Sequence, residues 1–227
     1  METRILWKTL VFTAIIFISG VGVGIWLDSM RVAELEDMME KMSFQSEDLR
    51  LQTLYFETFG QSMMYQAFQN YSNYSNFCDA AIQQNLIFGD RVYEEGLRIE
   101  RYEAANRLLP SLIAQKKKYV ILNTQFWFNS INLKKMCNAN YSTLIYFYSH
   151  YTQSMDQDVQ SKVLLDLKKE CGSRLILIAL PIDLDITTID AVKNQYNITE
   201  TPTLLINEEI KMEGLQKRED LEKILVC

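Results

Sequence analysis

The fold of the chain's last third can be predicted from the stretch TLIYFYSHYTQSM, residues 143–155. Its first part, Thr143–Tyr148, is rich in β-branched and aromatic residues and predicts a buried strand. The polar residues that follow predict a loop. About fifty residues later, Thr201-Pro202-Thr203 precedes the apolar run Leu204–Ile206, which predicts another short strand.

Further elements are predicted around these two strands. They are a helix over 157–171, a strand over 174–180, a helix over 188–196, strands over 203–207 and 211–215, and a helix over 218–225. Strands that alternate with helices in this way are typical of an α/β domain. The sequence therefore predicts an α/β domain over residues 139–227.

This domain resembles the thioredoxin superfamily over nearly all of its length. The resemblance rests on the strands IYFYS and ILIALPIDLD, the step NQYNITETPTLLI, and Gly214 after the last strand. Where that family has Cys-x-x-Cys, this chain has Thr152, Gln153, Ser154 and Met155. Because the redox step needs a reactive thiolate and a second thiol three residues on, the resemblance implies the fold without that chemistry.

The resemblance also implies a binding surface. In that superfamily the proline of the Thr-Pro loop is cis, faces the redox site and leaves backbone groups free to pair with an extended peptide. The surface would be lined by the degenerate loop and the proline loop: His150, Tyr151, Thr152, Met155, Thr201, Pro202 and Thr203. Tyr146 and Tyr148 would contribute where strand alternation turns them outward.

We predict no catalytic residue, metal or cofactor. His150 is the only histidine and is expected to be an exposed loop residue. Ser154 lies nearby, but no orienting acid or oxyanion hole accompanies the pair, which argues against a hydrolase. Neither metal-ligand spacing nor a phosphate-binding glycine loop is present.

Residues 9–27 contain no charge and are long enough to cross a membrane as a helix. A cleaved signal peptide is the alternative, although no A-x-A-like cleavage site follows. Arg4 and Lys8 precede the span and an acidic flank follows it, so we expect residues 1–8 in the cytoplasm and the rest outside, with lipid as a partner. Gly20 and Gly24 form a G-x-x-x-G step that would allow a homodimer.

Residues 28–138 predict a helical domain outside the cytoplasm. A first helix continues to about Gln69, with a break near 43–46 as an alternative, and a seven-residue apolar step suggests packing into its own bundle. A polar loop is expected over 69–77, then helices over 77–87, 91–109 and 111–136, the first of them broken at Gly89-Asp90. Residues 119–128 also have strand propensity.

Net charge −6 and a pI near 5.0 argue against nucleic acid as a partner, and the lysines of 116–118 are expected on a solvated helix face. Asn70 and Asn73 are the sequons best placed for glycosylation, in the polar loop.

The four cysteines are an even number in an exported region, which allows disulfides. The helix after the first strand and the last helix share a sheet face in a thioredoxin-like fold, so the resemblance implies a Cys171–Cys227 pair, with Cys78 and Cys137 as the second pair. Four unpaired buried cysteines are the alternative.

The expected function is binding. We predict a membrane-anchored, redox-inactive thioredoxin-fold protein that holds a polypeptide or organises a complex outside the cytoplasm. Two alternatives remain: a thiol–disulfide oxidoreductase component that uses Cys78 or Cys137, and a structural stalk that forms homo-oligomers.

Overall fold

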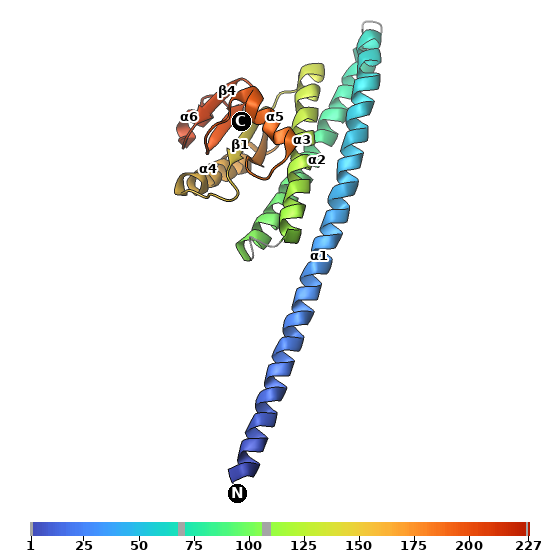
Figure 1. Cartoon of the computed structure of the whole chain (residues 1–227). Helices are drawn as coiled ribbons and strands as arrows, with labels where there is room; N and C mark the ends of the chain where they lie inside the picture. Colours follow the sequence, from blue (N-terminus) through green and yellow to red (C-terminus); the bar gives the residue numbers. More distant parts are fainter. Residues whose placement is uncertain (1, 68–70, 106–109, 226) are drawn as a thin grey trace. The chain divides into compact units, whose positions relative to one another are not determined.

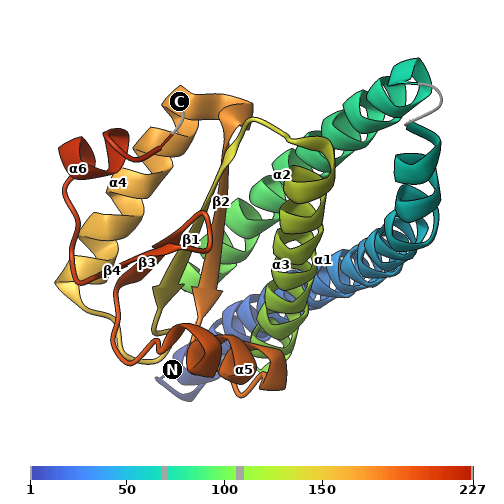
Figure 2. The same cartoon turned by 90° about the horizontal axis from the view of Figure 1, so that it is seen from above.

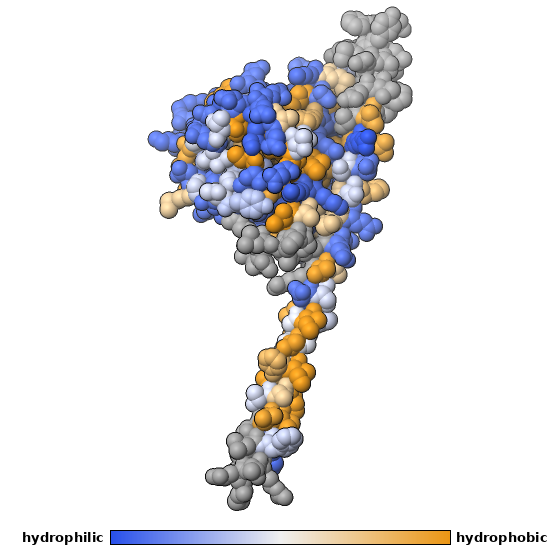
Figure 3. Space-filling view, viewed as in Figure 1, coloured by the Kyte–Doolittle hydropathy of each residue, from blue (hydrophilic) through white to orange (hydrophobic). Residues whose placement is uncertain are grey.

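The computed structural model describes residues 2–67, 71–105, 110–225 and 227. The chain divides into two compact units, residues 1–41 and residues 42–227. The first unit is the N-terminal part of helix α1 (Glu2–Ala67). Among the described residues, one helical stretch, Leu10–Met30, is long and apolar enough to cross a membrane. Figure 3 shows its apolar side chains on the helix surface.

The second unit contains the rest of α1 and all other elements (Figure 1). These are α2 (Tyr71–Ala105), α3 (Pro110–Cys137), β1 (Ser142–Tyr148), α4 (Met155–Cys171), β2 (Leu175–Pro181), α5 (Thr187–Tyr196), β3 (Thr203–Ile206), β4 (Ile210–Glu213) and α6 (Arg218–Glu222). A 3-10 turn, η1 (Gly172–Arg174), joins α4 to β2. From β1 onward the order of elements is the one that the sequence predicts.

The four strands form one mixed sheet in the order β2-β1-β3-β4. Strand β1 is parallel to β2, with Tyr146 opposite Ala179, and antiparallel to β3, with Tyr146 opposite Leu204. Strand β4 is antiparallel to β3. A βαβ unit followed by a helix and a ββα unit in this order is the thioredoxin-like fold. The predicted fold class is confirmed: an apolar N-terminal helix and a helical region precede a thioredoxin-like domain.

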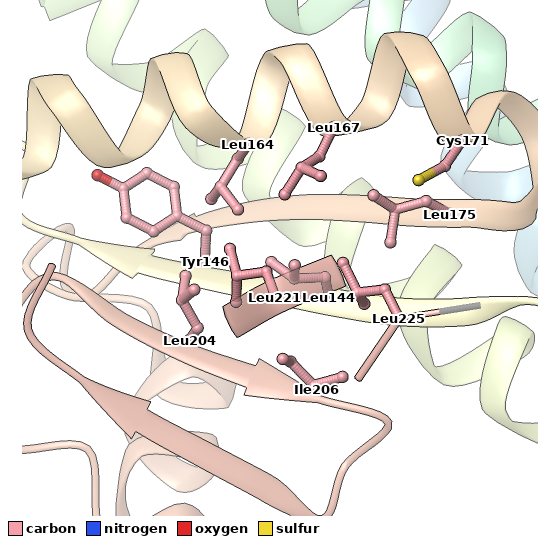
Figure 4. Close-up of a cluster of buried hydrophobic side chains, with 10 residues drawn as sticks. All are labelled: Leu144, Tyr146, Leu164, Leu167, Cys171, Leu175, Leu204, Ile206, Leu221 and Leu225. Carbon is pink, nitrogen blue, oxygen red and sulfur yellow. The ribbon is translucent and has the colours of Figure 1, made fainter. Parts of the chain in front are cut away.

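One face of the sheet packs against α4 and α6 (Figure 2). Successive residues of a strand point to opposite faces, so Leu144 and Tyr146 point to this side. They join a cluster of buried side chains from the sheet and both helices, shown in Figure 4: Leu144, Tyr146, Leu164, Leu167, Cys171, Leu175, Leu204, Ile206, Leu221 and Leu225. Burial of these apolar side chains is the main force that holds the two helices on the sheet.

The opposite face of the sheet is covered by α3 and α5 (Figure 2). Trp127 of α3 is fully buried, and its ring lies 6.1 Å from that of Tyr196 in α5. The Trp127 indole N–H donates to Glu208 Oε1 at 2.7 Å, and Lys134 Nζ donates to Asn207 Oδ1 at 2.8 Å. Helix α3 is therefore bound to the turn between β3 and β4 as well as to the sheet.

Helices α2 and α3 form an antiparallel pair, with Phe88 and Phe126 5.6 Å apart between ring centroids. The predicted break at Gly89 is wrong, because α2 continues through it. A Cβ on Gly89 would meet the Phe126 ring at 2.6 Å, so this glycine permits close helix packing. The predicted loop over 69–77 is also wrong from Tyr71 onward, where α2 has begun.

Helix α1 is continuous through 43–46, so the longer predicted helix is confirmed. Within the second unit, Met42 and Leu49 of the seven-residue apolar step are buried, and Ser46 donates to Gln125 of α3 at 2.8 Å. This part of α1 packs into the chain's own bundle. The segment 119–128 is helical, within α3, despite its strand propensity.

Candidate functional site

The degenerate loop, residues 149–154, joins β1 to α4 at the carboxyl end of β1. Asp183, which follows β2, accepts three hydrogen bonds from it: from Ser149 Oγ at 2.5 Å, from the His150 backbone N–H at 2.8 Å and from the Tyr151 backbone N–H at 3.0 Å. A single carboxylate therefore fixes three consecutive residues of the loop.

Gln157, in the first turn of α4, holds the loop from the other side. Its Oε1 accepts from the Ser149 N–H at 2.8 Å, and its Nε2 donates to the Thr152 carbonyl at 2.9 Å. Ser154 caps the same helix, since its side chain accepts from the Gln157 N–H. The loop that lacks the thiols is thus tied at both ends.

Burial raises the pKa of the Asp183 carboxyl, but the hydrogen bonds from Ser149 and from the backbone of Tyr151 and His150 act in the opposite direction and outweigh it. The net result is a pKa below the ordinary value of 3.8. Asp183 is therefore ionised at neutral pH, where its charge strengthens these hydrogen bonds.

His150 is buried, with 1% of its surface exposed, so its expected position on the surface is wrong. Its Nδ1 lies 2.9 Å from Lys116 Nζ and 3.5 Å from Glu103 Oε1, and the lysine and glutamate form an ion pair at 2.5 Å. Lys116 is itself buried, so the expected solvated face is also wrong for this residue, although Lys118 is exposed. Helices α2 and α3 reach the degenerate loop through this cluster.

The exposed side of the loop presents Tyr151 and Met155, which are 54% and 82% exposed. The Tyr151 ring packs edge-on against the buried His150 ring, with centroids 4.8 Å apart. Thr152 is also exposed. Tyr151, Met155 and the Thr152 hydroxyl are therefore exposed to solvent on a backbone that hydrogen bonds hold in place.

The proline loop lies beside this surface, because Phe147 at the end of β1 pairs with Thr203 at the start of β3. The Thr201–Pro202 bond is cis, as the resemblance implies. Thr201 is half-buried, whereas Pro202 and Thr203 are buried. We define the loop surface as Tyr151, Thr152, Met155 and Thr201.

All four cysteines form disulfides, in the pairs that the resemblance implies. The Cα atoms are 5.4 Å apart in Cys78–Cys137 and 4.6 Å apart in Cys171–Cys227. Cys137 precedes β1 and Cys171 ends α4, so both bonds lie at the end of the sheet opposite the degenerate loop; Figure 4 shows Cys171 and Tyr146 at opposite ends of the cluster. The structure does not bring Cys78 or Cys137 to the loop.

A cavity of about 210 Å³ lies between α2 and α3 on one side and α4 and the edge of the sheet on the other. Its lining includes both charged members of the His150 cluster, Glu103 and Lys116. Four tyrosines also line it: Tyr93, Tyr119, Tyr146 and Tyr148. No pattern in the sequence indicated this cavity.

Four polar residues that organise the loop were missed from the sequence: Glu103, Lys116, Gln157 and Asp183. Asp183 carried a weak signal, since an acidic residue directly after a buried strand faces the same sheet edge as the loop after β1. The other three carried none, because ordinary helix surfaces contain the same residue types.

The remaining predictions concern the glycosylation sites, the glycine step and metal binding. Asn70 lies outside the described residues, and Asn73 lies in α2. A Cβ added to Gly20 or Gly24 would meet nothing within 4 Å, so the dimer step stays a prediction. In the described ranges, no group of three or more His, Cys, Asp or Glu residues could hold a metal ion.

No protein-family model and no curated protein matches the chain. Solved structures of thioredoxins do match. Thioredoxin-2, described as a component of malaria parasite protein secretion machinery, is 19% identical over 39% of this chain and 87% of its own, with a TM-score of 0.32. Deadhead from Drosophila is 10% identical over 44% and 90%, with a TM-score of 0.34.

Thioredoxin O2 from Arabidopsis is 19% identical over 43% of this chain and 83% of its own, with a TM-score of 0.29. TM-scores this low do not indicate a shared function. The thioredoxin-like fold of the C-terminal domain rests on its sheet order, its connections and the position of the cis proline.

Proposed function

We propose that this chain is a membrane-anchored, redox-inactive thioredoxin-fold protein that binds a polypeptide or organises a complex outside the cytoplasm. The observation that carries the proposal is the loop surface. Its backbone is tied by Asp183 and Gln157, and it has no thiol, yet Tyr151 and Met155 remain exposed on it. Exposed aromatic and methionine side chains on a fixed backbone are typical of protein interfaces.

The anchor in this proposal is the stretch Leu10–Met30, with residues 1–8 in the cytoplasm. The two disulfides support this orientation, because an oxidising exterior favours their formation. Protease treatment of sealed vesicles tests it. When protease is applied from the cytoplasmic side, residues 31–227 should be cut only after the membrane is opened. Cutting of these residues in sealed vesicles would contradict the orientation.

Site-directed photo-crosslinking of the full chain in its native membranes tests the binding function. A photoreactive residue at Met155 should give a protein adduct of defined mass. A matched probe at Lys169, which is exposed near the opposite end of the same helix, should not. The substitution Tyr151→Ser should weaken the Met155 adduct, because it removes the exposed aromatic ring from the loop surface.

Equal adducts from both positions, or none from Met155, would contradict the loop surface as a binding site. A reductant separates this function from thiol chemistry. A Met155 adduct that persists under reductant supports binding. A partner found joined to Cys78 or Cys137, and released by reductant, would instead support the oxidoreductase alternative.

A further inference from the structure

The aromatic cavity next to the degenerate loop is separate from the loop surface. Its apolar lining comes from α2, α4 and β2 and includes Leu97, Leu165 and Leu177; polar and charged side chains line the rest. Its volume of about 210 Å³ is far above the roughly 10–15 Å³ that one water molecule needs. An organic group of several heavy atoms therefore fits inside it.

The charges around the cavity are unbalanced. Three carboxylates line it, those of Glu100, Glu103 and Asp158, and one cation, Lys116. Glu103 is neutralised by Lys116. Glu100 and Asp158 are exposed, and neither forms an ion pair with any side chain in the described part of the chain. Two unbalanced negative charges thus remain beside an aromatic wall.

The wall already accommodates an ammonium group. Lys116 Nζ lies 5.3 Å from the centroid of the Tyr148 ring, within the range of a cation–π interaction. Burial is the main cause that raises the pKa of Tyr119 to about 12, and Glu95 and Glu100 add to it. The hydroxyl of Tyr119 therefore stays neutral at neutral pH, and its oxygen can accept a hydrogen bond from an ammonium N–H.

We propose that this cavity binds a small organic cation, an alkylammonium, with its charge between Glu100 and Asp158 and its alkyl part against the tyrosine and leucine wall. The chemistry favours this class over the alternatives. A carboxylate or phosphate would meet two like charges at Glu100 and Asp158, and a neutral alcohol would leave those charges unpaired. An alkylammonium satisfies both the charge and the apolar wall.

Calorimetric titration of the full chain in a maltoside detergent tests the proposal, because that detergent carries no ammonium group. The probes are butylammonium, butanol and butyrate, which each have four carbon atoms and differ in charge. Saturable binding of butylammonium, with markedly weaker binding of butanol and none of butyrate, is the expected result. Equal binding of the three probes, or no saturable binding of butylammonium at millimolar concentration, would overturn the proposal.

A pair of double variants identifies the site. Glu100→Gln with Asp158→Asn should weaken butylammonium binding about tenfold, since two exposed charge interactions of ordinary strength together have that effect. Glu94→Gln with Asp156→Asn removes the same charge from exposed positions on the same two helices, outside the cavity lining, and should leave binding unchanged. Equal losses in both double variants would overturn the assignment to this cavity.

Two alkylammonium probes then distinguish a free amine from a lysine side chain. Butylammonium and the side chain of lysine amide acetylated on its α-nitrogen (here acetyl-lysine amide) present the same ammonium group, but only the second carries a peptide backbone. Tighter binding of the acetyl-lysine amide would assign the cavity to a peptide lysine, and tighter binding of butylammonium would assign it to a free amine. Both results retain the alkylammonium class.

Discussion

The two ends of the thioredoxin-like sheet are held by different chemistry. At the amino end of β1, the covalent bonds Cys78–Cys137 and Cys171–Cys227 fix the helices. At the carboxyl end, where the thioredoxin family has its thiols, the loop is held by hydrogen bonds to Asp183 and Gln157 and by the Lys116 ion pair. All four cysteines form disulfides at the end of the sheet away from the exposed loop.

The exposed loop is held in place without covalent bonds. A carboxylate that accepts three hydrogen bonds, and a buried lysine that lies against the loop histidine, replace the constraint that a disulfide would supply. Disulfides and hydrogen bonds differ in strength, so their removal should differ in effect.

The largest effect is expected from the disulfide end. The substitutions Cys171→Ser and Cys227→Ser together open a loop of 56 residues, which should lower the free energy of unfolding by about 4 kcal/mol, because the unfolded chain gains entropy. Urea unfolding of the full chain measures it. The pair Cys78→Ser and Cys137→Ser, with a separation of 59, should cost a similar amount. Unchanged stability in both would show that this end is not held covalently.

The next effect is expected from Lys116→Met. It leaves the Glu103 carboxylate partly buried without its cation, so the free energy of unfolding should fall by about 3 kcal/mol, at the lower end for a buried pair. The matched variant Lys118→Met changes an exposed neighbour and should shift it by less than about 0.5 kcal/mol. Equal changes in the free energy of unfolding for the two variants would contradict a stabilising role of the Lys116–Glu103 ion pair.

Asp183→Asn should have a smaller effect, about 1–2 kcal/mol, because the amide keeps one acceptor oxygen but loses the charge. The pKa of Asp183 is lowered on folding, so its stabilisation is present at neutral pH and is lost as the pH falls below 3.8. Unfolding measured at neutral pH and at about pH 3 should therefore show a weaker acid dependence in this variant. Asp185→Asn, at an exposed neighbour, is the control, and an equally flattened pH profile there would contradict the role of Asp183.

The smallest effect on stability is expected at the exposed side of the loop. Met155 is 82% exposed, so Met155→Ala should change the free energy of unfolding by less than about 0.5 kcal/mol. The same substitution should still abolish the adduct formed by a photoreactive residue at Tyr151. A large loss of stability with an unchanged adduct would contradict the binding role of Met155 and show that the residue stabilises the fold.

The sequence predicted the sheet domain well because its signals are local. The run Thr143–Tyr148 and the Thr-Pro step before Leu204 are read directly from residue type and order, and the structure has strands at both places. Boundaries in the helical region were less predictable. Gly89 looks like a helix stop, yet the decisive fact is its contact with Phe126, which lies 37 residues further along the chain and reaches it only in the folded bundle.

The candidate site was harder to predict for the same physical reason. The loop positions could be found from the family spacing, but the burial of His150 could not, because it depends on Lys116 and Glu103, which lie 34 and 47 residues earlier. Such contacts depend on how α2 and α3 pack on the α/β domain. Local patterns contain no information about that packing.

The turn between β3 and β4 limits how evolution can rearrange this gene. Trp127 and Lys134 belong to the helical region, but their hydrogen-bond partners Glu208 and Asn207 belong to the thioredoxin-like domain. Exchange of residues 139–227 for a domain without an acceptor at the position of Glu208 would leave a buried indole N–H unpaired. The two segments therefore share contacts that a domain exchange would break, whereas the exposed side chain of Met155 can change without that cost.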